Sequence, residues 1–137
     1  VLILTYSCGT DRGKGTFYKY TIKNNSGKAI TIKGYTTMYP DVSPIITNLS
    51  IGEELTKTYQ DGLPPSPPYR FSNFFGNIDN PKDSIKVVYN NSKVSYFIPD
   101  QNVRNPLNSN VYNKTEETFV FTQQDYDNAA DCNGNCD

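Results

Sequence analysis

The residues best able to do chemistry in this chain are its three cysteines, Cys8, Cys132 and Cys136. An odd count means that at least one of them has no cysteine partner within the chain. Cys132 and Cys136 lie in a polar segment, and Gly134 between them permits a tight loop. If Cys8 is used otherwise, these two can form a disulfide in an oxidising compartment. Their spacing is wider than Cys-x-x-Cys and no second pair follows, which disfavours zinc.

The first eight residues suggest a separate use for Cys8. Val1–Leu4 is an apolar run that leads through Thr5–Ser7 to the cysteine, after which the chain becomes polar. This is typical of the end of a secretory signal, although a basic segment and an initiator Met are missing. Leu4–Cys8 resembles a bacterial lipobox, which implies that Cys8 is the cleaved and lipidated residue, although Tyr6 is bulkier than the strict pattern. The alternative is a buried first strand over residues 1–7 with Cys8 as a buried thiol.

The remaining side chains offer little for catalysis. The sequence has no histidine, which excludes Ser-His-Asp and Cys-His nucleophiles and His-ligated zinc. Glu53–Glu54 and Glu116–Glu117 are adjacent carboxylate pairs, but neighbours in a strand point to opposite faces, so we expect solvated edge charges instead of a glycosidase pair. The phosphate-binding glycine motifs are also missing. We therefore expect a protein that is not an enzyme and that uses no cofactor.

One cation site deserves consideration at the C-terminal tail. Asp131, Asn133, Asn135 and Asp137 place oxygen ligands at alternate positions, which resembles the opening of an EF-hand-type calcium loop. Cys136 stands where that loop has glycine, and the sequence ends before the bidentate acid of the twelfth position. Calcium is therefore the weaker hypothesis, and a polar tail closed by the disulfide is the preferred one.

The elements that position these candidate residues are expected to be β-strands. Residues 16–23 alternate strictly, with Tyr18, Tyr20 and Ile22 on one face, and residues 29–35 alternate again. The polar segment 24–27 between them contains Asn, Ser and Gly, which tolerate the positive φ of tight turns. The pattern predicts a β-hairpin formed by these two strands.

Further alternating segments complete the predicted fold. Strands are expected at 53–60, at 84–89 and 93–98 as a second hairpin, and at 116–122, with a short edge strand at Ile45–Ile46. Thr122 followed by Asp125 predicts a capped short helix. The fold class is therefore all-β: a single β-sandwich, immunoglobulin-like or related, of about six to seven short antiparallel strands with a short C-terminal helix. Its expected bounds are 16–137, after a leader at 1–8 and a flexible tether at 9–15.

An aromatic segment flanks a cluster of prolines between Pro64 and Pro68, which predicts a polyproline II connection. Aromatic rings near such a connection can stack on sugars or anchor a protein interface. The alternative is that they fill the core of a sandwich that contains no tryptophan. The predicted candidate binding surface comprises Tyr59, Tyr69, Phe71, Phe74 and Phe75.

Two kinds of modification motif are present. Asp83-Ser84-Ile85 resembles the short O-glycosylation site of exported Bacteroidota proteins, although a polar start to the strand at Ile85 is the preferred interpretation. The Asn-x-Ser/Thr tripeptides matter only in a eukaryotic secretory host. They begin at Asn24, Asn48, Asn90 and Asn113.

Charge is nearly balanced, with 13 basic and 14 acidic residues. The composition therefore gives no sign of the excess positive charge that binding to nucleic acid requires. Together with the lipobox, residues 18–27 and 132–136 resemble the small lipoproteins of the Bacteroidota outer membrane. The resemblance implies a lipid-anchored protein at the bacterial outer membrane, on its periplasmic or cell-surface face, and implies no activity. We expect a non-catalytic binding module or accessory subunit with a protein partner in that membrane. The alternative is a β-sandwich that binds a carbohydrate or another small ligand.

Overall fold

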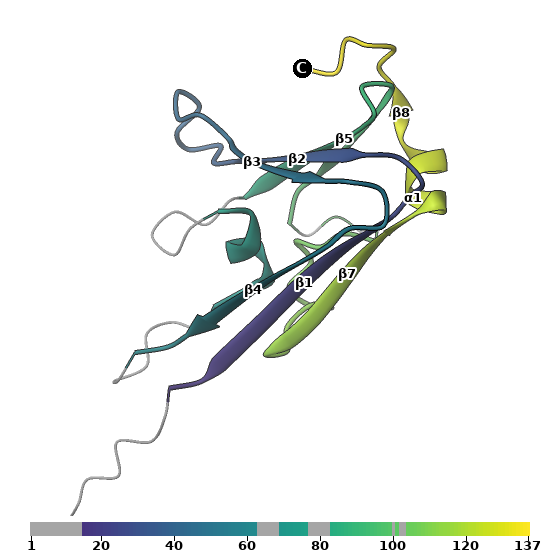
Figure 1. Ribbon diagram of the computed structural model, residues 1–137. Coiled ribbons are helices and arrows are strands. Elements are labelled where there is room, and N and C mark those ends of the chain that lie inside the picture. Colours follow the sequence, from purple (N-terminus) through teal and green to yellow (C-terminus); the bar gives the residue numbers. More distant parts are fainter. Residues whose placement is uncertain (1–14, 63–68, 77–82, 100, 102–103) are drawn as a thin grey trace, which may run out of the picture.

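The computed structural model describes residues 15–62, 69–76, 83–99, 101 and 104–137. The predicted leader with Cys8, most of the predicted tether and the proline cluster lie outside the described residues. Two β-sheets pack against each other with one short α-helix beside them, which confirms the predicted all-β sandwich (Figure 1). In the described ranges, no helix is long and apolar enough to cross a membrane.

The first sheet has three strands in the order β4-β1-β7. The central strand β1 (Phe17–Asn25) runs antiparallel to β4 (Glu54–Gln60) and parallel to β7 (Glu116–Thr122). The parallel pair departs from the predicted antiparallel arrangement. It is possible because the strands β2 to β6 lie between β1 and β7 in the sequence, so no tight turn has to join the two.

The second sheet has five strands in the order β3-β2-β5-β6-β8, all antiparallel to their neighbours. The second predicted hairpin, formed by β5 and β6, is confirmed. Asn90 and Asn91 form its turn, with φ values of 47° and 52°. Thr122 caps α1 as expected, because its hydroxyl accepts the backbone N–H of Asp125. The bounds are β2 Ile30–Tyr35, β3 Ile45–Leu49, β5 Ser84–Tyr89, β6 Lys93–Phe97, β8 Ala130–Asp131, α1 Gln123–Asn128 and the 3-10 helix η1 Phe71–Phe75.

The predicted hairpin of β1 and β2 is wrong, because the two strands belong to different sheets. The segment between them is a corner that carries the chain from one sheet to the other. Asn24 is fully buried there, and its Nδ2 donates to the backbone carbonyls of Lys28, Leu49 and Ser50. Its Oδ1 accepts the hydroxyl of buried Ser26 at 2.6 Å. Asn24 thereby joins the β1–β2 corner to the β3–β4 corner.

Aromatic side chains fill the space between the sheets. Tyr20 of β1, Phe119 of β7 and Tyr89 of β5 belong to one core cluster, and all three are fully buried. The sheets diverge away from the corners, and η1 lies in the gap (Figure 1). Phe71, Phe74 and Phe75 of η1 are each at most 2% exposed. These three residues are therefore core and not a binding surface, because large rings are needed to fill a core that has no tryptophan.

Candidate functional site

The strand directions give the sandwich two dissimilar ends. We call one the corner end, formed by the connections 24–29, 50–53 and 90–92 and placed on the right in Figure 1. The opposite side, on the left in Figure 1, is where the two diverging sheets end separately: residues 15–17 lie at its lower part, and the β2–β3 connection 36–44 lies at its upper part. We call this side, together with residues 96–98 of the second sheet, the loop end. β1, β3 and β5 start at the loop end, whereas β2, β4 and β6 finish there.

A groove of about 420 Å³ opens at the loop end, between the β2–β3 connection and the ends of β5 and β6. We call it the tyrosine groove. Its lining is mainly aromatic and aliphatic, and its polar side chains are hydroxyls. The lining residues are Tyr35, Thr36, Thr37, Tyr39, Pro40, Val42, Ser84, Ile85, Tyr96, Phe97 and Ile98.

Much of this lining is exposed to solvent. Tyr39 is 57% exposed and Tyr96 is 62% exposed, and Val42 and Ile98 are exposed beside them. Covering a large apolar side chain contributes roughly 1.5–3 kcal/mol, so leaving several uncovered at one place forgoes that stabilisation. Clustered exposed apolar side chains of this kind are typical of binding surfaces.

Hydrogen bonds hold the wall of the groove in place. The carboxylate of Asp83 accepts the backbone N–H of Thr37 at 3.0 Å and its hydroxyl at 2.6 Å. The Asp83 N–H donates to the carbonyl of Tyr35, and the Tyr39 N–H donates to that of Thr36. The connection is thus formed before any ligand arrives, which lowers the entropic cost of binding. Ser84 follows as the first residue of β5, as predicted, and its O-glycosylation stays a hypothesis from the sequence.

Register explains why the groove lies where it does on the second sheet. On its outer face, Thr31, Val88 and Val94 form one row across β2, β5 and β6. Lys33, Lys86 and Tyr96 form the next row toward the loop end, and Tyr35 and Ser84 form the last. The C-terminal tail covers the first row, whereas the last row lines the groove. Lys86 between them is buried, with its Nζ 5.7 Å from the centre of the Tyr96 ring.

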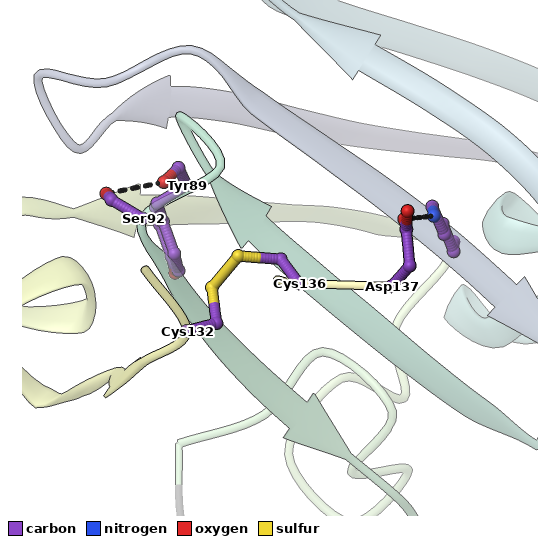
Figure 2. The surroundings of a disulfide bond; sticks show 6 residues. Tyr89, Ser92, Cys132, Cys136 and Asp137 are labelled. Carbon is purple, nitrogen blue, oxygen red and sulfur yellow. Dashed lines mark hydrogen bonds and ion pairs between the residues drawn. A yellow bond between two sulfur atoms is a disulfide. The ribbon is translucent and has the colours of Figure 1, made fainter. Parts of the chain in front are cut away.

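The tail is held by the predicted disulfide. Cys132 and Cys136 are bonded, with Cα atoms 5.1 Å apart (Figure 2). Cys136 is buried against Val88 and Val94. Beyond it, the Asp137 carboxylate lies 2.9 Å from the Lys33 ammonium. This hydrogen-bonded pair raises the pKa of Lys33 and lowers the pKa of Asp137.

The predicted calcium ligands lie along this same tail. Asp131 is in β8 opposite Lys93, Asn133 has a positive φ, and the Asn135 N–H donates to the Cys132 carbonyl. The Asp137 carboxylate would have to leave Lys33 to reach a cation. In the described part of the chain, groups of three or more His, Cys, Asp or Glu side chains at metal-binding range are absent. The calcium hypothesis stays a prediction.

Other sequence-predicted positions are separated by the fold. Glu54 lies opposite Lys23, whereas Glu116 lies opposite Lys19 and forms an ion pair with it, so the two carboxylate pairs do not meet. Asn24 is inaccessible as a glycan acceptor because it is fully buried in the corner.

The remaining members of the predicted binding surface, Tyr59 and Tyr69, pack onto the core. Their rings stack at 4.8 Å, and the Tyr59 hydroxyl donates to the carbonyl of Asn73 in η1. Burial raises the pKa of Tyr59 to about 12. The expected aromatic face is thus an interior layer, and the exposed apolar surface is elsewhere. The sequence signal for the groove was the pair Tyr39 and Val42 in a loop, where apolar side chains have no core to enter.

Comparison with known proteins finds no matching family model, curated protein or solved structure.

Proposed function

We propose that this protein is a non-catalytic binding module, anchored by a lipid on Cys8, that binds a protein partner of the bacterial outer membrane through the tyrosine groove. The observation that carries the proposal is the preformed groove with exposed Tyr39 and Tyr96. Tyrosine is enriched among the residues that dominate protein–protein binding energy. An accessory subunit of a membrane assembly fits this surface and the lipobox-like start.

The chemistry of the groove favours an apolar occupant. Its polar side chains are hydroxyls, and the nearby Asp83 carboxylate is already engaged by Thr37. An apolar side chain of a partner can fill such a groove without leaving charges unpaired. Tyr96 of the groove lies on β6 beyond Lys93 and Val94, the two residues that pair with β8 among the described residues.

A carbohydrate or other small ligand is the second candidate. The exposed rings of Tyr39 and Tyr96 offer flat surfaces on which the apolar face of a sugar can stack. Sugar recognition also needs hydrogen-bonding side chains aimed at the hydroxyl groups, and Ser84 and Thr37 supply few. The protein partner is therefore preferred.

Site-specific photo-crosslinking tests the proposal. A photoreactive phenylalanine analogue at Tyr96 is expected to crosslink a defined protein in native membranes, whereas the same analogue at Ile51 of the corner end is the matched control. Ile51 is 66% exposed, so both probes reach their surroundings equally. Mass spectrometry of the mature N-terminus, expected to show diacylglyceryl on Cys8 and loss of residues 1–7, tests the anchor.

The two candidates give different results. Crosslinks of equal yield from both positions, or from neither, contradict a protein-binding groove. Binding on a glycan array that the Tyr96→Ser variant abolishes would establish the carbohydrate alternative. If the protein binds no glycan on the array and its melting temperature is the same with and without calcium, the small-ligand candidate is excluded.

A further inference from the structure

Exposed apolar side chains are distributed unevenly over the described part of the sandwich. Almost all of the large ones belong to the loop end, and they come from both sheets. Phe17 is the first residue of β1, and Ile46 is the second residue of β3. The loop-end set is Phe17, Met38, Tyr39, Val42, Ile46, Tyr96 and Ile98. Outside it, Val111 lies in the connection before β7, and Ile51 is at the corner end.

The corner end, by contrast, is mainly polar, and Ile51 is its one large exposed apolar side chain among the described residues. Its connections contain Asn24 to Gly27, Ser50 to Glu53 and Asn90 to Ser92. The Ser50 N–H donates a hydrogen bond to the Glu53 carboxylate. The Gly52 N–H donates to the backbone carbonyl of Asn24. A binding groove alone does not explain this asymmetry, because Phe17 and Ile46 do not line the groove.

The chain enters the described domain at the same loop end. This step rests on the proposed lipid anchor. Cys8 precedes Gly15 by seven residues, and seven residues span at most about 25 Å even when fully extended. A lipid on Cys8 therefore holds Gly15 and the start of β1 within that distance of the bilayer surface, on the side of the domain that faces away from the corner end.

We propose that the loop end lies directly against the bilayer, with Phe17, Met38 and Tyr39 in contact with the lipid headgroup layer. Aromatic residues with a polar tip are favoured at that layer, and apolar side chains enter its acyl boundary. The tyrosine groove then opens beside the membrane surface. A groove in that position meets segments of a partner that emerge from the bilayer.

The natural absence of tryptophan makes the contact measurable. The variants F17W and M38W each place one fluorophore at the loop end, and I51W is the control at the corner end. Met38 is 76% exposed, Phe17 is 62% exposed and Ile51 is 66% exposed, so the three substitutions are tolerated alike. The acylated full chain is reconstituted into phosphatidylethanolamine–phosphatidylglycerol vesicles with or without brominated acyl chains.

Brominated lipid is expected to lower the emission of F17W and M38W about two-fold, because side chains at the interface reach the acyl boundary. The emission of I51W is expected to stay unchanged. Equal quenching of all three variants, or none in F17W and M38W, overturns the proposal. Unquenched F17W and M38W together with a protein crosslink at Tyr96 would identify the loop end as a protein interface instead of a lipid contact.

A separate measurement distinguishes failure of the proposed lipid anchor on Cys8 from failure of the proposed contact between the loop end and the bilayer. If mass spectrometry finds no lipid on Cys8, the proposed anchor is wrong, and the same three variants are mixed with the vesicles without reconstitution. Selective quenching of F17W and M38W would then still support the lipid contact, and its absence would overturn that contact as well. Overlapping far-UV circular dichroism spectra confirm that each variant is folded.

Discussion

The corner end and the loop end of the sandwich are both ordered by side-chain hydrogen bonds, but they differ in what they leave exposed. At the corner end, Asn24 is buried with its amide fully engaged. At the loop end, Asp83 holds the connection through Thr37, yet Met38 and Tyr39 beside it are exposed. The exposure at the loop end is therefore a feature of an ordered surface. One end stabilises the fold, and the other is available for contact.

The largest effect is expected from Asn24→Ala. The substitution removes the donor for three backbone carbonyls and the acceptor for Ser26, so unfolding free energy should fall by about 3–4 kcal/mol. Urea unfolding measures the loss. Asn25→Ala is the matched control, because Asn25 is the exposed last residue of the same strand, β1. Equal stability of the two variants would show that the corner does not depend on the Asn24 amide.

Removal of the disulfide should have the next largest effect. The double variant C132S/C136S is expected to lose about 2 kcal/mol of unfolding free energy, because only a short loop is closed. Hydrogen exchange should increase in β6 and β8, where the tail is attached. The hydrogen-exchange protection of the Ile22 amide in β1 should fall only by the amount that the global free energy of unfolding falls. A loss confined to the first sheet would contradict the assignment of the tail to the second sheet.

Attachment of the tail should also depend on pH. The pKa of Asp137 is lowered in the folded state, so its contribution is present above the unfolded pKa and is lost as pH falls through the folded pKa. The pKa of Lys33 is raised, so its contribution is present below the unfolded pKa and is lost as pH rises through the folded pKa. NMR signals of the Val88 and Val94 methyls should report a closed tail between these limits. In Lys33→Gln the methyl signals should lose the acid-side transition.

The smallest effect on stability is expected at the loop end. Tyr39→Ser and Tyr96→Ser should each change the unfolding free energy by less than about 0.5 kcal/mol, because both side chains are exposed. Tyr39→Ser should abolish crosslinking from the photoreactive residue at position 96, and both substitutions should abolish binding of the partner at the groove. Ile51→Ser is the control that should leave both properties unchanged. A large loss of stability in Tyr39→Ser would mean that the loop end supports the fold.

Local patterns explain why much of the fold was predictable. The alternation of Tyr18, Tyr20 and Ile22 marks β1, and the turn at Asn90–Asn91 marks the second hairpin. Thr122 and Asp125 mark the start of α1. Each of these signals lies within a few residues of the structure that it determines. The disulfide was predictable for the same reason, since Cys132 and Cys136 are close in sequence.

The candidate site was harder to predict. Aromatic residues near the prolines suggested a surface, but Phe71, Phe74 and Phe75 are core. The residues that do form a surface, such as Tyr39 and Tyr96, are far apart in the sequence and meet only when β2, β5 and β6 align. Hydrophobicity of a residue does not by itself determine its exposure, because exposure depends on what packs above it.

By itself, the sequence determined the strands, their inward faces, the tight turn, the helix cap and the restricted catalytic repertoire of a chain without histidine. The tertiary structure decided which sheet each strand joins, the parallel pairing of β1 with β7, the burial of η1 and the exposure of the loop end. The physical reason is range. Backbone conformation and side-chain alternation are set by neighbouring residues, whereas strand partners and exposure are set by contacts between distant segments, as at Asn24, whose amide joins two corners.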